Sequence, residues 1–213
     1  NKIIQANNIV SAVGLYNTFN KLIKSELVPE EYFNFMDKTS PSVCHFYCFV
    51  NLKGTPKELG LRSSNMWIYP HGDYEKLIQD FYDDPFESPI PSFIAFSSMK
   101  DETWNVEGKS NAIVLGVVKK EWFEEWENKK CMKRGKEYID YKKLIGKRLM
   151  EEGLFKYFPN LRDKVINIDY GSPLTSQFYL GCMNGESYGI DMNSDRLLDL
   201  DYLKPRTLID NLY

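Results

Sequence analysis

A ten-residue run at 43–52, Val-Cys-His-Phe-Tyr-Cys-Phe-Val-Asn-Leu, constrains the fold more than any other stretch. Side chains alternate between the two faces of a β-strand, and in this run both faces are largely apolar. The pattern therefore predicts a central strand that is covered on both sides. Within such a packed layer, we expect His45 to be a hydrogen-bonded structural residue rather than a catalytic base.

Other segments supply further strands and helices around this run. Short apolar runs predict strands at 9–14, 66–70, 93–96, 112–117 and 165–168, and helical periodicity predicts helices at 15–23, 29–37, 73–82 and 136–158. The apolar stripe of the last helix is expected to contain Tyr141, Leu144, Ile145 and Leu149. This order of elements predicts an α+β fold with a mixed or antiparallel sheet covered by helices.

Composition and charge exclude several classes of protein. The chain has 213 residues, and its hydrophobic content of 43% suffices for a packed core. Its 27 basic and 30 acidic residues give a net charge of −3, without the basic excess of a nucleic-acid-binding protein. The four cysteines form no CxxC pair and the two histidines are far apart, so no metal site is expected. No apolar run approaches the roughly 20 residues of a membrane-spanning helix.

The sequence lacks the short motifs that carry catalysis in many enzymes. It contains no glycine-rich dinucleotide fingerprint, no P-loop, no GxSxG and no HExxH. Neighbouring carboxylates such as Asp83 and Asp84 are adjacent in the chain and do not converge on regular structure. The catalytic residues therefore stay unknown, and the chain alone is expected to have no catalytic power.

The segment 171–189 is unusual because it combines four glycines, one proline and three aromatic residues. It shows no helical period, and glycine and proline favour tight, irregular backbone. The sequence therefore predicts an irregular loop. Two interpretations stay open: a plain surface connection, or a loop that lays backbone and aromatic rings against a flat ligand.

The same segment contains two short motifs, Ser-Pro-Leu-Thr at 172–175 and Gln-Phe-Tyr-Leu at 177–180. With these motifs it resembles the retinol saturase family of flavoproteins, which belongs with the carotenoid isomerases and phytoene desaturases. Further matches are Val-Ser-Ala-Val-Gly-Leu-Tyr-Asn-Thr at 10–18, Ser-Met-Lys-Asp-Glu-Thr-Trp at 98–104 and Glu-Trp-Phe-Glu-Glu-Trp at 121–126. The similarity covers nearly the whole chain.

The resemblance implies the substrate domain of a two-domain flavin oxidoreductase. Residues 1–24 would be the strand and helix that return from the flavin domain, 25–200 the substrate domain, and 201–213 the segment that leads back. The flavin-binding fingerprint would lie upstream, so the chain would be a fragment of its parent. FAD, reduced by NAD or NADP and bound mainly by the missing part, would deliver hydride to a double bond of retinol or a related polyene, because side chains cannot supply hydride.

The resemblance also implies site residues and a location. Those expected nearest the flavin are Ser11, Ala12 and Gly14, and those expected to line the polyene are Thr175, Phe178, Tyr179, Tyr188 and Gly189. The partner would be a retinoid or other polyene, with no nucleic acid. The parent would reside at the endoplasmic reticulum membrane, associated through parts other than this chain.

Two positions depart from the family pattern. Family members read Pro-Arg-Gly where this chain has Met183, Asn184 and Gly185. They read Gly-x-Asp-His at the positions of residues 189–192, where this chain has Met192 in place of the histidine. The loss of an arginine and a histidine motivates one alternative, a non-catalytic lipid- or polyene-binding relative. A separate alternative is a flavoprotein related to amine or protoporphyrinogen oxidases, although the runs at 172–175 and 177–180 are closer to the saturase pattern.

Overall fold

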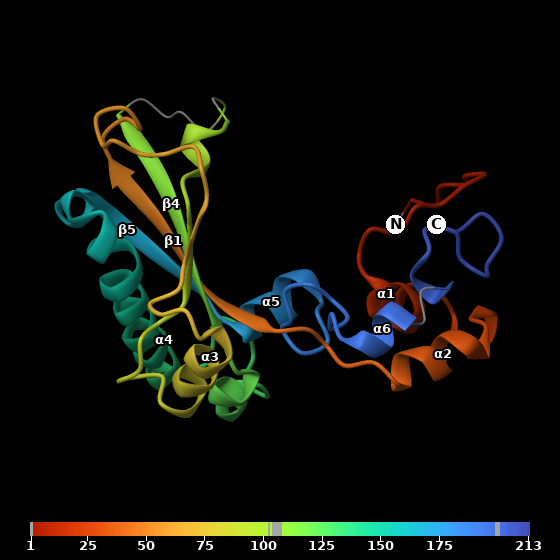
Figure 1. Ribbon diagram of the computed structural model, residues 1–213. Helices are drawn as coiled ribbons and strands as arrows, with labels where there is room; N and C mark the ends of the chain where they lie inside the picture. The colour runs from red at the N-terminus through yellow and green to blue at the C-terminus, as the bar shows by residue number, and fades with distance from the viewer. Residues whose placement is uncertain (1, 102, 104–107, 199–200) are drawn as a thin grey trace. The chain divides into compact units, whose positions relative to one another are not determined.

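The computed structural model describes residues 2–101, 103, 108–198 and 201–213 (Figure 1). Glu102 and Trp104 of the family-like motif lie outside the described residues. The chain divides into two compact units. We call residues 44–175 the sheet unit, and residues 1–43 with 176–213 the terminal unit. The assignment of residues 1–24 and 201–213 to a flavin-domain connection stays a prediction.

The sheet unit is built on a five-stranded sheet in the order β2-β3-β4-β1-β5. Every pair of neighbouring strands is antiparallel, so of the two predicted sheet types the antiparallel one is confirmed. β1 lies between β4 and β5, which agrees with the interior position predicted for residues 43–52. The strands are β1 (Cys44–Lys53), β2 (Met66–Ile68), β3 (Ser92–Ala95), β4 (Lys109–Val118) and β5 (Val165–Gly171).

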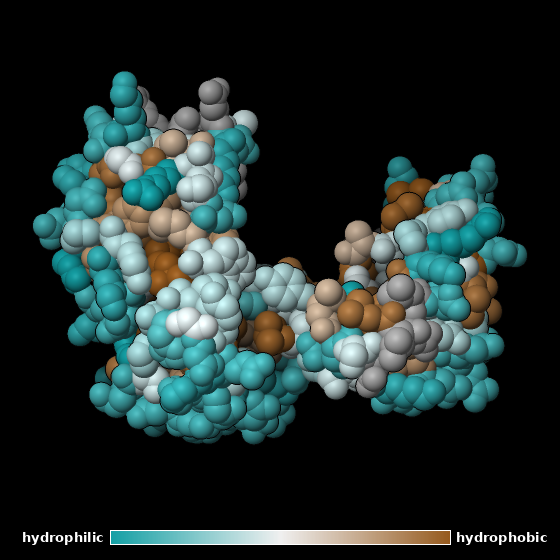
Figure 2. Space-filling model, in the orientation of Figure 1, coloured by the Kyte–Doolittle hydropathy of each residue, from teal (hydrophilic) through white to brown (hydrophobic). Residues whose placement is uncertain are grey.

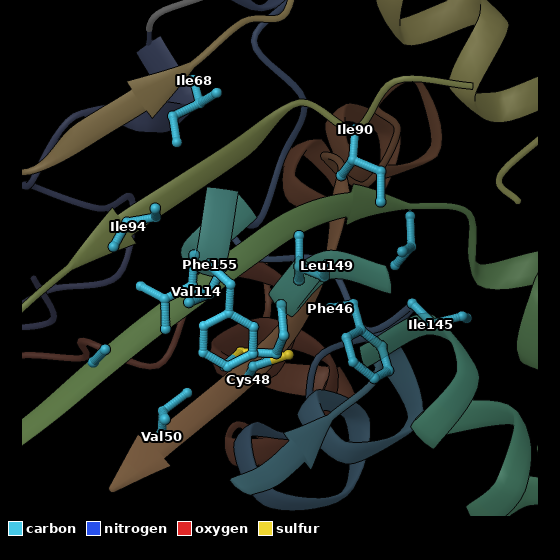
Figure 3. Close-up of a cluster of buried hydrophobic side chains, with 14 of the residues drawn as sticks. Phe46, Cys48, Val50, Ile68, Ile90, Ile94, Val114, Ile145, Leu149 and Phe155 are labelled. Atoms are coloured by element: carbon cyan, nitrogen blue, oxygen red, sulfur yellow. The ribbon is translucent and has the colours of Figure 1, made fainter. Parts of the chain in front are cut away.

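One helical layer packs against this sheet. Its main helix, α4, continues directly into the π-helix η6 and presents Ile145 and Leu149 to Phe46 and Cys48 of β1 (Figure 3). The helix backbone lies close to the strand here, since the Cys48 thiol donates a hydrogen bond to the carbonyl oxygen of Gly146 at 3.8 Å. The helices of the unit are α3 (Tyr74–Asp83), η3 (Ser97–Met99), η5 (Lys120–Trp126), α4 (Lys136–Leu149), η6 (Met150–Phe155) and η7 (Pro159–Lys164).

The prediction that residues 43–52 are covered on both sides is wrong. Phe46, Cys48, Val50 and Leu52 face the helical layer and are buried. On the opposite face, His45 is buried but Phe49 is 45% exposed. The difference arises because α4 and η6 cover one face of the sheet, while most of the other keeps its apolar side chains without a helical cover.

Two smaller predictions also fail. Residues 9–14 form no buried strand: Ile9 makes a single parallel bridge to Leu212, and Val10 is largely exposed. Within the described part of the chain, this run pairs with the short segment 211–213, through backbone hydrogen bonds of 2.6–2.8 Å. Leu144, assigned to the apolar stripe of α4, is 52% exposed, because it lies on the helix face turned away from the sheet.

The terminal unit has its own small core of aromatic residues. Phe19 stacks on Tyr32 with ring centroids 3.9 Å apart, and Tyr202 packs edge-on against Tyr32 and stacks on Phe35. Its helices are α1 (Leu15–Asn17), which continues as η1 (Thr18–Leu22), then η2 (Ser25–Leu27), α2 (Glu30–Asp37), α6 (Ser194–Leu198) and η8 (Asp201–Leu203). The helices predicted at 15–23 and 29–37 are confirmed.

Candidate functional site

Part of the segment 171–189 is helical, which corrects the prediction of an irregular loop. Residues 173–180 form α5 (Pro173–Leu180). Ser172 precedes it as an N-cap would, and the Thr175 hydroxyl accepts a hydrogen bond from the Ser172 backbone N–H at 3.1 Å. Pro173 suits the first helical position, and Gly181, with φ of 69°, ends the helix. These capping residues define a short helix that hydrophobic periodicity does not reveal.

The following segment, residues 182–190, is irregular but held in place. The carboxylate of Glu186, a buried residue, accepts hydrogen bonds from the backbone N–H groups of Met183 at 3.2 Å and Asn184 at 2.7 Å. The backbone N–H of Ser42 donates to the Gly189 carbonyl at 2.7 Å, and its hydroxyl accepts from the backbone N–H of residue 188 at 3.0 Å. Each carboxylate oxygen of the buried Glu186 accepts one of these hydrogen bonds, and such a buried polar network fixes the conformation of the loop.

A pocket of about 490 Å³ lies in the terminal unit, between two chain segments. One wall comes from residues 12–17, at the start of α1, and the other from residues 179–190. The wall is mainly apolar and includes Leu180, Cys182 and Met183, with Glu186 as its acidic group. Burial raises the pKa of the Cys182 thiol, so this thiol is expected to remain protonated near neutral pH.

Four of the predicted site residues meet at this pocket: Ala12, Gly14, Tyr179 and Gly189. Gly14 and Gly189 have φ of 87° and 71°, and a Cβ on either would meet no atom within 4 Å. The two glycines therefore permit the backbone turns that shape the walls, and they leave open space beside them. Tyr179 is 68% exposed, so its ring is free to lie along a ligand.

The other four predicted site residues lie outside the pocket lining. The Ser11 hydroxyl forms a hydrogen bond with the Thr18 hydroxyl at 2.6 Å. Thr175 belongs to the N-terminal turn of α5. Phe178 packs edge-on against Tyr179, with centroids 4.9 Å apart. Tyr188 is exposed. Four of the eight predicted site residues therefore line this pocket, and their contacts with a flavin or a polyene stay predictions. The sequence did not indicate Glu186, whose hydrogen bonds depend on the loop backbone.

A second candidate surface is the face of the sheet that the helical layer leaves uncovered. Strand register places Trp67 of β2 opposite Phe93 of β3, Phe93 opposite Leu115 of β4, and Leu115 opposite Tyr47 of β1. Phe49 lies beside Tyr47, with parallel rings 5.9 Å apart. We call these five residues, together with Ile113, the aromatic sheet face.

The aromatic sheet face is partly open to solvent. Trp67 is 58% exposed and packs edge-on against Phe93, with ring centroids 4.7 Å apart. Neighbouring strands lie about 4.8 Å apart, so the row from Trp67 to Tyr47 spans roughly 14 Å. Figure 2 shows apolar residues, in brown, exposed on both units. The sequence signal for this face was present in the alternation of residues 43–52, but those outward residues were expected to be covered.

One end of the aromatic sheet face holds a small cavity and a buried histidine. The cavity, about 70 Å³, is lined by His45, Trp67 and Phe93, among others. His45 is 4% exposed, and burial lowers the pKa of its imidazole to about 4. The ring is therefore neutral near pH 7, so it adds no charge to an apolar surface. This agrees with a packed rather than a catalytic histidine.

Comparison with known proteins gives these surfaces a context. An all-trans-retinol 13,14-reductase from Macaca fascicularis is 35% identical over 96% of this chain. One from Homo sapiens is 34% identical over 96%, and one from Danio rerio 30% identical over 99%. The chain is homologous to the all-trans-retinol 13,14-reductases. The resemblance to retinol saturase is thereby confirmed.

The homology has defined limits. The chain spans 35–36% of the length of these retinol reductases. A further relative, the inactive all-trans-retinol 13,14-reductase of Danio rerio, is 26% identical over 99% of the chain. No protein-family profile matches the chain. Among the described residues, no helix is both long and apolar enough to cross a bilayer.

Proposed function

We propose that this chain is part of an FAD-dependent oxidoreductase that saturates a double bond of retinol or a related polyene. The observation that carries the proposal is the 30–35% identity to retinol 13,14-reductases along 96–99% of the chain. The proposal includes NAD or NADP as the source of electrons and the endoplasmic reticulum membrane as the location, both by resemblance alone.

The aromatic sheet face supports a polyene substrate. A conjugated polyene is long, flat and apolar, and the row from Trp67 to Tyr47 offers a surface of matching character across four strands. Covering a half-exposed aromatic ring removes apolar area from water, at about 25 cal/mol per Å². In the proposed complex, Trp67 and Phe49 would therefore contribute most, because they are the most exposed members of the face.

The pocket of the terminal unit fits a flat ring system. Its walls are mainly apolar, and the open space beside Gly14 and Gly189 accommodates a planar group. It does not fit a pyrophosphate, since the sequence offers no glycine-rich phosphate loop. When bound, FAD supplies the hydride that no side chain can. Ala12 and Gly14, the residues expected nearest the flavin, would then contact the ring. Tyr179 and Gly189, which were expected to line the polyene, would contact the ring from the other wall, while the rest of the cofactor needs residues outside this chain.

A second candidate function is polyene binding without catalysis. The existence of a relative named as inactive favours it, together with Asn184 and Met192, where family members carry arginine and histidine. Against it, the chain is more similar to the relatives named as reductases, at 30–35%, than to the inactive one, at 26%. None of the relatives described above is named as an amine oxidase, so that alternative has no support from them.

The test measures polyene binding, because both candidate functions require it. All-trans-retinol is titrated into the chain, and the emission of the retinol itself is followed. We expect saturable binding that a short-chain alcohol does not displace. Trp67→Ala and Phe49→Ala should each weaken retinol binding by about tenfold, which corresponds to about 1.4 kcal/mol.

Tyr157→Ala is the matched control, because it removes an aromatic ring of similar exposure elsewhere in the sheet unit. It should bind retinol as the unmodified chain does. Equal binding by all variants, each shown to be folded by circular dichroism, would contradict the assignment of the aromatic sheet face. Turnover by the parent protein would then separate a reductase from an inactive binder.

A further inference from the structure

The chain carries a strong local concentration of positive charge, although its net charge is −3. Residues 129–148 hold nine of the 27 basic side chains but only two of the 30 acidic ones. They comprise α4 and the loop that precedes it, which belong entirely to the sheet unit. Charge asymmetry of this kind points to an anionic partner.

Three of the five basic residues of α4 lie on its outward face. The buried residues of the helix are Tyr138, Ile145, Gly146 and Leu149, which face the sheet unit's core. Lys136, Lys143 and Lys147 are all exposed and, at spacings of seven and four, follow one line along the opposite side. In Figure 2 the surface over α4, at the left edge, is mostly hydrophilic.

The preceding loop extends this line of charge. Lys129, Lys130 and Lys133 are exposed. The loop is attached to the helix by Arg134, whose guanidinium lies 5.3 Å from the ring centre of Tyr138. Within the part of the chain that the structure describes, none of these three lysines, nor Lys136, Lys143 and Lys147, forms an ion pair within 4.0 Å.

Large apolar side chains are exposed among these lysines. Met132, at the tip of the loop, is 88% exposed and has φ of 65°. On α4, Ile139 and Leu144 are 51% and 52% exposed and flank the line of lysines. The lysines alone would suffice to bind a soluble polyanion, which does not need exposed apolar side chains. Lysines mixed with projecting apolar side chains are instead typical of segments that lie on a bilayer surface.

We propose that this basic face, made of Lys129, Lys130, Lys133, Lys136, Lys143 and Lys147 with Met132, Ile139 and Leu144, docks on a membrane that contains anionic phospholipids. The lysines would lie at the headgroups, and the three apolar side chains would enter the headgroup boundary. This inference deepens the membrane location of the proposed function and rests on it, but it assigns the membrane contact to this chain rather than to other parts of the parent. An apolar polyene would also be found in such a membrane.

The test is flotation of the chain with retinoid-free vesicles. One set is pure phosphatidylcholine, and in the other about a third of the lipid is phosphatidylserine. We expect binding to the anionic vesicles only, and a large loss of binding when NaCl rises from about 0.1 M to about 0.5 M. Lys129→Gln, Lys130→Gln and Lys133→Gln together should weaken binding on the order of 100-fold, at about fivefold for each lysine.

The control removes three exposed lysines from elsewhere in the sheet unit, by Lys53→Gln, Lys57→Gln and Lys109→Gln, and should bind normally. Met132→Ser with Leu144→Ser should weaken vesicle binding but leave weak binding to polyglutamate unchanged. Equal binding to both kinds of vesicle, equal loss in the control, or tighter binding to polyglutamate than to vesicles would overturn the proposal. Because no retinoid is present, failure here would not bear on polyene binding.

Discussion

Replacing Gly146 by alanine tests how α4 lies on the sheet, and hence which face stays open. A Cβ at this position would lie 2.1 Å from Cε1 and 2.5 Å from Cδ1 of the Tyr170 ring in β5. Tyr170 faces the helical layer, since it pairs with Cys48 and its ring lies 5.9 Å from that of Phe46. Alanine at 146 therefore forces the ring or the helix to move.

The magnitude follows from two opposing effects. Overpacking a core costs about 1–3 kcal/mol, whereas alanine in place of glycine inside a helix gains about 1 kcal/mol. Gly146→Ala should therefore lower the free energy of unfolding by about 0–2 kcal/mol. With Tyr170→Ala present, the obstacle is gone, and Gly146→Ala should raise the free energy of unfolding by about 1 kcal/mol.

The assay is urea unfolding of the four proteins of this cycle, followed by circular dichroism and analysed by linear extrapolation. The expected coupling between the two positions is about 1–3 kcal/mol. If Gly146→Ala changes stability by the same amount in both backgrounds, α4 does not approach β5 as described, and the distinction between the covered and the open face fails.

Three further outcomes are expected. Leu149→Ala, at a fully packed position of α4, should lower the free energy of unfolding by about 2–5 kcal/mol, whereas Leu144→Ala on the exposed side should change it by less than about 0.5 kcal/mol, both measured by urea unfolding. Gly189→Val should lower the free energy of unfolding by about 1–3 kcal/mol, because valine is strained at a φ of 71°. Gly189→Asn should leave the melting temperature nearly unchanged, since asparagine tolerates this conformation, and so should Tyr179→Ala at its exposed position. The pKa of His45 is about 4 in the folded chain, below its ordinary value of 6.5, so the unfolded chain binds the proton first as the pH falls. The free energy of unfolding should therefore fall by up to about 3 kcal/mol as the pH drops from about 6.5 to 4. In unfolding experiments across this range, His45→Gln should remove that dependence.

Local signals predicted much of the fold. The helix predicted at 73–82 begins where expected, and the carboxylate of its N-cap, Asp73, accepts a hydrogen bond from the Lys76 backbone N–H at 3.0 Å. The strand at 43–52 and the helix from residue 136 onward lie where alternation and helical periodicity placed them. Such signals depend on neighbouring residues, so they are readable without knowledge of the rest of the structure.

What the sequence could not predict depends on contacts between distant segments. Leu144 and Phe49 belong to apolar patterns, yet both are exposed, because the position of a helix over a sheet decides which apolar residues are covered. The walls of the pocket come from residues 12–17 and 179–190, and spacing along the chain does not indicate that these segments meet. The family resemblance singled out Ala12, expected near the flavin, and Tyr179, expected along the polyene, and the structure places both at this pocket. Glu186 carries no motif and is recognised only from its hydrogen bonds.

Covalent mapping of a bound retinoid tests the central claim most directly. A retinol analogue with a photoreactive group is bound to the chain and irradiated, and the labelled peptides are identified by mass spectrometry. The aromatic sheet face predicts labels in peptides that contain Tyr47, Phe49, Trp67 and Phe93, and excess retinol should suppress them. Labels confined to the pocket residues 12–17 and 179–190, or labels that retinol does not suppress, would contradict a polyene site on this face.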